Sequence, residues 1–548
     1  MRQAFISIFI LIPFIGQSQQ TVGIFQNDSL SFNGYTLFAP MSSFTTYLID
    51  NCGNSVHQWE SDYRPGAVAY LHEDGHLYRA GALPSSFFNG GGKGGRIEEF
   101  DWDGNLVWSF EYATEEYHLH HDIEILPNGN ILAISWDKHS IEEAIQLGKD
   151  PNTVLIQTWP DKIIELEKVG NSSANIVWEW KAWDHLVQDF DNSLPAFGAI
   201  SEHPELLDIN YPYTSANSDW MHCNAVDYNP DLDLIIISSH GLKEMWIIDH
   251  STDAEEVQTH AGGNYGKGGD ILYRFGNPAA YARGDEADQK FFQQHDVQWI
   301  TEGLPYAGQI LVFNNRGGAG FNSAVERFAL PYDNEGVFDE IGLDPYGPEE
   351  FLWHYEAPDF FSMNISGVQM QSNGNLLICE GQTGRIFEID EDQETHWTYK
   401  NPDGSTGPVS QGVNPPGSNV FRAYRYATDY PAFEGVLFDE PAPIELNPWE
   451  YECDIHGDSM TSGLDNEYTF AELRLANPFS TELSFNIEKY SSESYFKVWS
   501  SLGQIVHQGK IRDSAVSINT SEWRQGIYIL QLTDIESQLS SSYRLIKL

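Results

Sequence analysis

Three histidines stand at the heads of separate β-strand patterns, and their side chains could share one chemical task. They are His121 in the segment His120–Glu124, His222 in Asp219–Asn224 and His295 in Gln293–Val297. Imidazoles can bind a metal as neutral ligands. Alternatively, one can serve as a nucleophile while the others donate hydrogen bonds to an oxyanion. His120 and Asn224, which adjoin these histidines, are further candidates for substrate binding.

The repeat that contains these histidines predicts the fold that must position them. Short apolar runs broken by Asn-Gly, Asp-Gly and Gly-Gly turns dominate the chain, and helical periodicity is scarce, which indicates an all-β protein. An inner strand, a tight turn and further strands ending in a Trp-rich one recur from Val68, Ile123, Asn224, Val297 and Val368. In the unit that begins at Val297, only two later strands are predicted, at Ile310–Asn314 and Leu352–Tyr355.

A sixth unit can be assembled from both ends of this region, by joining Phe421–Tyr426 to strands within Tyr35–Asp50. Six four-stranded units closed in this way predict a six-bladed β-propeller, whose inner strands line a central channel. Corresponding residues of the blades converge on that channel, so we expect His121, His222 and His295 to meet there.

The same geometry makes predictions about neighbouring residues. Adjacent strand residues point to opposite faces, so Asp122 and Asp296 should face away from the channel and hold nearby backbone or supporting groups. Three long connections, Phe87–Gly95, Ala182–Ser218 and Glu255–Asp270, exceed what hairpins need and are expected to form lids or pocket walls.

Composition restricts the compartment and the partners. The formal net charge of −51 over 548 residues disfavours nucleic acid and anionic membranes as partners. Residues 1–18 combine one positive charge, a short apolar run and small residues, which predicts a secretory signal peptide, and no other segment is apolar enough to span a membrane. In an exported protein, Cys52 and Cys453 could pair and staple the ring near its closure.

The character of the chain changes after Pro448. We expect the propeller to cover residues 19–448, a linker 449–464, and a small β-sandwich 465–548. The C-terminal part resembles the sorting domain of type IX secretion substrates, in its Asn477-Pro478-Phe479 start, its Val498–Gln504 centre, its Gly526-Ile527-Tyr528 and its basic-apolar end. That resemblance implies contact with the type IX machinery and a secreted or outer-membrane-surface location.

The propeller resembles the bacterial arylsulfate sulfotransferases, which do not depend on the nucleotide sulfate donor. The likeness covers roughly residues 30 to 440 and rests on His120–Ile123 with Leu126–Asn130, on Trp220–Val226, on Ser238-Ser239 and on Gln294–Asp296. It implies that His295 takes a sulfuryl group from an aryl sulfate and passes it to a phenol. It also implies that His121 and His222 act as donors or acid/base groups.

One position departs from the family pattern. The family has an arginine after the Ser-Ser pair, where this chain has His240. Arginine offers a permanent charge to sulfate oxygens, whereas histidine offers at most a titratable one. His240 could take the role when protonated, or Arg316 could reach the site from the next blade.

Two other functions remain open at this stage. The histidines could hold the metal of a lactonase- or esterase-type hydrolase, or the propeller could be a non-catalytic secreted binding protein. Sulfuryl transfer requires no cofactor, and for that function no metal site is expected.

Overall fold

The computed structural model describes residues 20–153, 157–212, 218–333, 336–338, 342–449, 453–455, 474–475, 479–486, 494–500, 505–512, 515–521, 523–534 and 539–547. The predicted signal peptide, residues 1–18, and most of the predicted linker lie outside these ranges. The chain divides into two compact units, Met1–Asp458 and Ser459–Leu548, which are described separately. Among the described residues, no helix has the length and apolar character needed to cross a membrane.

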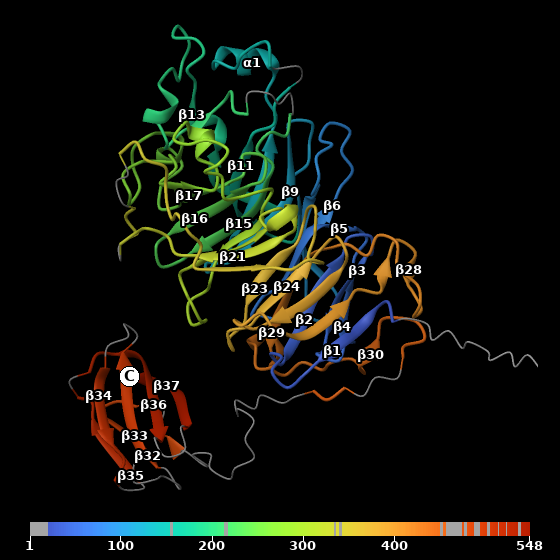
Figure 1. Ribbon diagram of the computed structural model, residues 1–548, viewed down its shortest axis with the longest axis vertical. Coiled ribbons are helices and arrows are strands. Elements are labelled where there is room, and N and C mark those ends of the chain that lie inside the picture. The colour runs from blue at the N-terminus through green and yellow to red at the C-terminus, as the bar shows by residue number, and fades with distance from the viewer. Residues whose placement is uncertain are drawn as a thin grey trace, which may run out of the picture. The chain divides into compact units, whose positions relative to one another are not determined.

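Within the described residues, the first unit contains six four-stranded blades, of which blades 2 and 3 are joined into one eight-stranded sheet by a parallel bridge between Ala67 and His121. Figure 1 labels strands of every blade. Blade 1 contains β29 (Val420–Ala427), β2 (Gly34–Pro40), β3 (Thr45–Ile49) and β4 (Asn54–Glu60). Blade 2 contains β5 (Pro65–Leu71), β6 (Leu77–Ala82), β7 (Gly95–Phe100) and β8 (Leu106–Glu111). Blade 3 contains β9 (Tyr117–Ile125), β10 (Ile131–Asp137), β11 (Asp161–Val169) and β12 (Ser173–Lys181).

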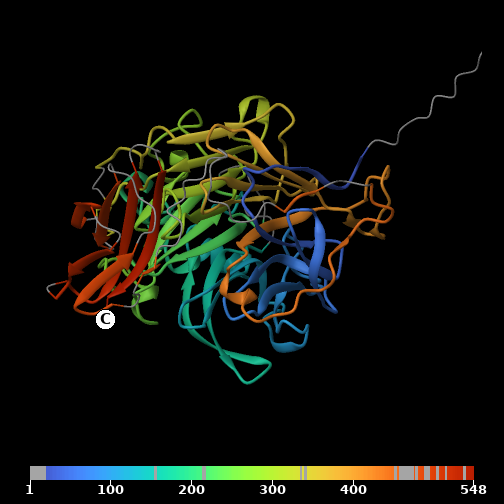
Figure 2. The same cartoon turned by 90° about the horizontal axis from the view of Figure 1, so that it is seen from below.

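The other three blades follow in chain order, as the ribbon colours in Figure 2 show around the ring. Blade 4 contains β15 (Cys223–Asn229), β16 (Leu234–Ser239), β17 (Glu244–Asp249) and β18 (Tyr273–Phe275). Blade 5 contains β19 (His295–Trp299), β20 (Ile310–Asn314), β21 (Ala324–Phe328) and β22 (Trp353–Glu356). Blade 6 contains β23 (Gly367–Met370), β24 (Leu376–Glu380), β25 (Arg385–Ile389) and β26 (Thr395–Lys400).

The remaining elements are short. Edge strands β1 (Gly23–Asn27) and β30 (Ala442–Pro443) extend blades 6 and 1. Two small ladders pair β13 (Leu186–Val187) with β14 (Leu207–Asp208) and β27 (Asp403–Gly404) with β28 (Gly407–Pro408). Helix α1 (Ile141–Gln146) has a Ser140/Glu143 capping box. Short 3-10 helices lie at Ala182–Asp184, Ile200–Glu202, Glu256–Gln258, Pro278–Tyr281, Ala319–Phe321 and Pro431–Phe433.

The inner strands establish the ring directly. β5 contacts β9, and the contacts continue through β15, β19, β23 and β29 back to β5. Apolar clusters fill the spaces between successive blades, including the space between blades 6 and 1, where Phe38 and Tyr47 pack with Trp397 and Tyr399. The inner part of each blade is therefore buried on both faces, which explains fully buried strands such as β16, with its apolar run from Leu234 to Ile237. The fold prediction of a closed six-bladed propeller is confirmed.

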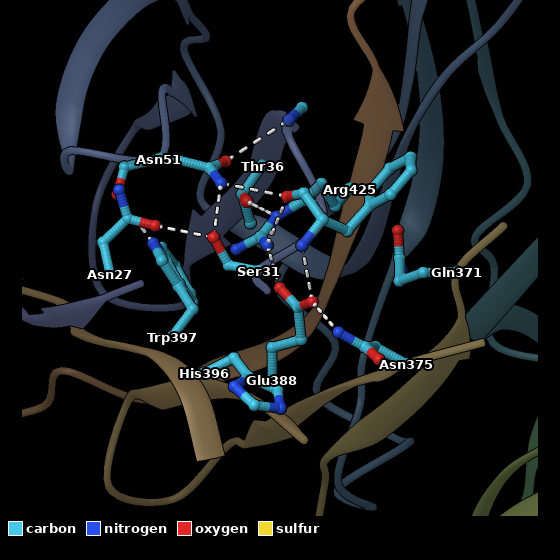
Figure 3. Close-up of polar contacts among 12 residues, drawn as sticks. Asn27, Ser31, Thr36, Asn51, Gln371, Asn375, Glu388, His396, Trp397 and Arg425 are labelled. Atoms are coloured by element: carbon cyan, nitrogen blue, oxygen red, sulfur yellow. Dashed lines mark hydrogen bonds and ion pairs between the residues drawn. The ribbon is translucent and has the colours of Figure 1, made fainter. Parts of the chain in front are cut away.

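The two ends of the propeller chain meet in blade 1, where β29 pairs with β2, as the sequence predicted. Figure 3 shows the buried ion pair between Arg425 of β29 and Glu388 of β25, which joins blade 1 to blade 6. Arg425 also donates to Thr36 at 2.9 Å and lies over the Trp397 ring at 4.1 Å. A disulfide joins Cys52 to Cys453, so the predicted pairing is confirmed.

The sequence missed two blade strands: β4 (Asn54–Glu60), which lies beyond the predicted Tyr35–Asp50 segment, and β21. β21 (Ala324–Phe328) was not predicted because it contains Glu326 and Arg327, which interrupt the apolar pattern. Both side chains are nevertheless buried: Glu326 accepts from Asn314 at 2.9 Å, and Arg327 pairs with Glu391 at 2.8 Å. Ion pairs and hydrogen bonds thus allow a charged segment to serve as a central strand.

The second unit is a small β-sandwich, as predicted. One sheet has the order β31 (Arg474–Leu475), β32 (Glu482–Asn486) and β35 (Ala515–Asn519). The other has the order β34 (Ile505–Lys510), β33 (Ser494–Ser500), β36 (Gly526–Asp534) and β37 (Leu539–Lys547). Phe485, Phe496, Val498 and Leu530 form part of its separate core.

Candidate active site

The three predicted histidines lie together in the channel, and His240 joins them. Ring centroids are 4.6 Å apart for His121 and His222, and 5.2 Å apart for His222 and His240. The centroids of His240 and His295 are 5.4 Å apart. Four imidazoles from the inner ends of blades 3, 4 and 5 therefore form one continuous cluster.

Irregular backbone at the start of each inner strand aims these rings. His121 and His222 have left-handed φ values of 57° and 49°, and Asp296, next to His295, has 56°. Each of these three strands also shows a register shift against its neighbour at this point. Such bulges re-aim side chains, and histidine and aspartate tolerate left-handed backbone better than most residues.

His222 is paired with a carboxylate. Its Nδ1 lies 2.6 Å from Asp219 Oδ2, and Trp136 donates to the other oxygen of Asp219 at 2.8 Å. Burial alone would lower the pKa of His222, but the Asp219 carboxylate outweighs it and raises that pKa. The imidazole therefore holds a proton on Nε2 more readily than a free histidine, as a general acid requires.

His295 has the opposite character. Burial lowers the pKa of His295 to about 3. Its Nδ1 donates a hydrogen bond of 2.7 Å to Asn315 Oδ1, which favours the protonated ring but does not outweigh burial. Since Nδ1 carries the proton donated to Asn315, Nε2 holds a lone pair, which accepts from the Ile365 N–H at 3.1 Å. The ring is neutral, oriented at both nitrogens and only 2 % exposed.

His121 is held from behind by His120. The Nδ1 atoms of the two residues are 2.8 Å apart, and His120 Nε2 lies 2.9 Å from Asp161 Oδ1. Because a carboxylate only accepts, His120 donates to Asp161 through Nε2, and its Nδ1 shares a hydrogen bond with Nδ1 of His121. Burial, together with the neighbouring histidines, lowers the pKa of His121 well below its ordinary value. His120 is buried with both ring nitrogens occupied, so it orients His121.

A cavity of about 260 Å³ opens onto His222 and His240. Its walls are Pro212, Asp219, Trp220, His222, His240, Gly241, Lys243 and Gln293. Burial lowers the pKa of His240 well below its ordinary value, and His295 and His222, followed by Arg316 and Lys243, lower it further. His240 is therefore neutral at neutral pH, and the permanent positive charge at this cavity comes from Lys243. A larger cavity of about 440 Å³, lined by residues such as Glu205 and Tyr346, contains none of the channel histidines.

The predicted pocket wall at Phe87–Gly95 lies against the histidines. A Cβ atom on Gly92 would lie 2.2 Å from His121 Nε2, and one on Gly90 would lie 2.5 Å from Asp219 Oδ2. The backbone of this glycine loop thus approaches the site more closely than any residue with a side chain could. Gly92 also accepts a hydrogen bond from the His121 N–H at 2.8 Å.

The expected orientation of Asp122 and Asp296 is wrong. Both carboxylates meet on the guanidinium of Arg422 in the channel, at 2.7 and 2.9 Å. The bulges interrupt the alternation of side chains between the two faces of the strand, on which the prediction relied. The histidine and the aspartate that follows it can therefore both face the channel. The supporting role was predicted correctly, because Asp122 accepts from the Val226 N–H and Asp296 from the Val368 N–H.

Two further predicted residues lie away from the cavity walls. Asn224 is fully buried and donates to Gln294 O at 2.8 Å, which links blades 4 and 5. Arg316 is half-buried and acts on His240 through its charge. Sequence reasoning missed Asp219, Asn315, Lys243 and Arg422. Only Asp219, three residues before His222, had a local signal.

Residues 42–407 match the family described as Arylsulfotransferase (ASST), and residues 477–547 match the secretion system C-terminal sorting domain. No curated protein sequence matches the chain. The second match indicates that the chain is exported to the medium or the outer-membrane surface.

Three solved structures show remote similarity. A protein of unknown function from Bacteroides caccae is 10% identical, with 72% of this chain and 99% of that chain covered and a TM-score of 0.37. Virginiamycin B lyase from Staphylococcus aureus is 10% identical, with coverages of 72% and 89% and a TM-score of 0.32. PorZ, from the type-IX secretion system of Porphyromonas gingivalis, is 10% identical, with coverages of 94% and 50% and a TM-score of 0.27. These scores are too low to inform the function.

Proposed function

The chain belongs to the arylsulfotransferase family, and we propose that it transfers a sulfuryl group from an aryl sulfate to a phenol through a sulfohistidine on His295. The observation that carries this proposal is the contrast between two imidazoles of one cluster. His295 is neutral with a lone pair on Nε2, whereas the pKa of His222 is raised by Asp219. Opposite pKa shifts in one site are typical of paired nucleophile and acid/base roles.

In the first half-reaction, His295 Nε2 attacks sulfur as the bond to the aryl oxygen breaks. The His222 imidazolium gives its proton to the departing oxygen, so phenol leaves and the sulfuryl group stays on His295. In the second half-reaction, neutral His222 takes the proton of the acceptor phenol, whose oxygen attacks sulfur. The new aryl sulfate leaves, and both imidazoles return to their starting states.

Negative charge on the three sulfuryl oxygens needs donors, by analogy with phosphoryl transfer. We assign Lys243 as the permanent charge near the cavity, with His240 as a neutral donor and His121 as a further acid/base or donor group. His120, Asn224 and Arg316 are assigned as positioning residues, because His120 holds His121, Asn224 links blades 4 and 5, and Arg316 acts on His240 through its charge. Trp220, which does, can contact the aryl ring.

The site has to rearrange before this reaction. His295 does not line the cavity, although its ring centroid is 5.4 Å from that of His240, and the Ile365 N–H occupies its lone pair. Breaking one such hydrogen bond costs about 0.5–1.5 kcal/mol, which is small beside the barriers that enzymes lower. Shifts of loops and side chains that complete a site on substrate binding are common.

We also propose the division of the chain into a signal peptide at 1–18, an enzyme domain at 19–448, a linker at 449–464 and a sorting domain at 465–548. The separate cores of the two described units support this division. The sorting domain implies that the type IX machinery is a partner.

Steady-state kinetics test the proposal. The protein is incubated with a chromogenic aryl sulfate at several fixed phenol concentrations, and both phenol release and the new aryl sulfate are followed. Sulfuryl transfer predicts parallel double-reciprocal lines and one aryl sulfate formed per donor consumed. Phenol release at the same rate without acceptor would contradict transfer and favour hydrolysis.

The two alternatives have distinct outcomes. A metal-dependent hydrolase would lose an essential metal ion when His121 or His295 is changed to alanine. A binding propeller would show no turnover and would retain its ligand after all three channel histidines are changed to alanine.

A further inference from the structure

A second cluster of potential ligands lies outside the channel, where the connection between blades 3 and 4 meets the β17–β18 segment of blade 4. His185, His260 and Asp270 each offer one ligand atom, and these atoms lie within 4.8 Å of one another. The Nδ1 atoms of His185 and His260 are each 2.8 Å from Asp270 Oδ1. We propose that these three residues bind a zinc ion, independently of the transfer reaction.

The hydrogen bonding of His185 shows why a cation belongs there. Its Nε2 lies 2.9 Å from the carbonyl oxygen of Val257, which can only accept, so Nε2 carries a proton. In the neutral ring, Nδ1 is then a bare lone pair that faces a carboxylate. A metal ion between this lone pair and the Asp270 carboxylate would be bound by both groups.

Three features favour the metal ion. A histidine ligand usually donates its other ring N–H to a carbonyl or carboxylate, as His185 does to Val257. Two imidazoles and one carboxylate are a common ligand set for zinc. The His185 ring is fully buried and lies parallel to the Trp180 ring, with an interplanar angle of 3°, so its lone pair has a fixed direction.

The cluster can accommodate the ion with a small movement. Zinc bonds of about 2.0–2.1 Å in a tetrahedron separate ligand atoms by roughly 3.3 Å. Each 2.8 Å contact must therefore lengthen by about half an ångström. The His260 side chain is 62% exposed and can retreat without disturbing a core, which leaves the fourth position for water.

Such an ion would link the long segment between β17 and β18 to the connection between blades 3 and 4. His260 and Asp270 both lie in the segment between β17 and β18, and five glycines, at 262, 263, 266, 268 and 269, lie between these two residues. A glycine-rich segment loses much conformational entropy on ordering. Binding of zinc to the folded form would offset part of that loss.

The test uses the full chain, freed of metal by a chelator and dialysed. Zinc content is measured by mass spectrometry after titration with ZnCl₂, and the melting temperature is measured with and without the ion. We expect one tightly bound zinc per chain and a rise in melting temperature of roughly 2–4 °C. Cobalt should give the visible absorption bands of a tetrahedral site.

The variants His260→Ala and Asp270→Asn should weaken zinc binding at least about 100-fold. His260 is exposed, so its removal leaves the fold intact. The matched control His203→Ala removes a half-buried histidine, whose ion pair within the described part of the chain is with Glu205, and should bind zinc normally. His295→Ala should also bind zinc normally. Failure to bind one equivalent, or equal binding by the His260→Ala and His203→Ala variants, would overturn the proposal.

Discussion

At the scale of single residues, the protein gives chemically identical side chains different hydrogen-bond partners and therefore different properties. His222 and His295 are both channel histidines, but only His222 faces a carboxylate. His295 instead faces the neutral amide of Asn315, which orients the ring without adding charge. The side-chain partner therefore decides whether an imidazole is held as an acid or as a lone-pair donor.

Asp219→Asn tests the acid role of His222. Asp219 raises the pKa of His222, and only the protonated ring, present below that pKa, can protonate the leaving oxygen. Removing the carboxylate charge lowers the pKa, so the alkaline limb of the kcat/KM profile should move to lower pH. We expect the rate to fall about 10²–10⁴-fold for phenyl sulfate and far less for nitrophenyl sulfate, whose phenolate leaves unaided. An unchanged limb, or equal losses for both donors, would exclude this role.

The sequence predicted the histidines because equivalent positions of a repeat converge in a ring. It could not predict most of their partners, because those partners come from other strands of the same blade or from other blades. Asn315 reaches His295 from the end of β20, and Arg422 reaches Asp122 and Asp296 from β29. Nothing in the local pattern around Arg422 distinguishes a channel cation from a surface one.

At the scale of elements, bulged strand ends and a glycine loop shape the site. The sequence predicted most blade strands, but strand alternation could not predict the left-handed residues at the bulges, and these turn Asp122 and Asp296 into the channel. The loop between β6 and β7 then closes over His121, where Gly92 has a φ of 65°. The backbone of Gly92, rather than a side chain, thus forms the wall of the site next to His121.

Gly92→Ala tests the glycine loop. The new methyl group would lie 2.2 Å from His121 Nε2, so either the loop or the ring must move. A displacement of about 1 Å in a catalytic group can cost about 100-fold in rate, and we expect a loss of that order in kcat.

Gly104→Ala is the matched control, because Gly104 has a similar φ of 79° and open space around its Cβ position. It bears the same backbone strain of about 1–2 kcal/mol without a contact to the site. If both variants keep full activity at equal stability, the loop does not position His121.

At the scale of the whole molecule, the propeller and the sandwich have separate cores and separate tasks. The sequence predicted both, because each shows its own strand pattern, and it predicted the composite blade 1 because the ring otherwise lacks a sixth sheet. Cys453 bonds to Cys52 of blade 1, so the covalent frame of the propeller extends beyond its last strand.

A chain that ends at residue 455 tests the division of labour. It retains Cys453 and every propeller strand but lacks the sandwich. We expect normal kcat and an unchanged melting transition for the propeller, measured on purified protein. In the native host, the same chain should fail to reach the surface. Loss of turnover in a folded truncated chain would show that the sandwich contributes to the enzyme.

The proposed mechanism requires His295 to carry the sulfuryl group. The most direct measurement is mass spectrometry of the protein after rapid mixing with an aryl sulfate and no acceptor. We expect one added sulfuryl group on a peptide that contains His295, and we expect phenol to remove it. The folded His295→Ala variant should show neither labelling nor transfer. A label on His121 or His222 instead, or turnover that persists without His295, would contradict this mechanism.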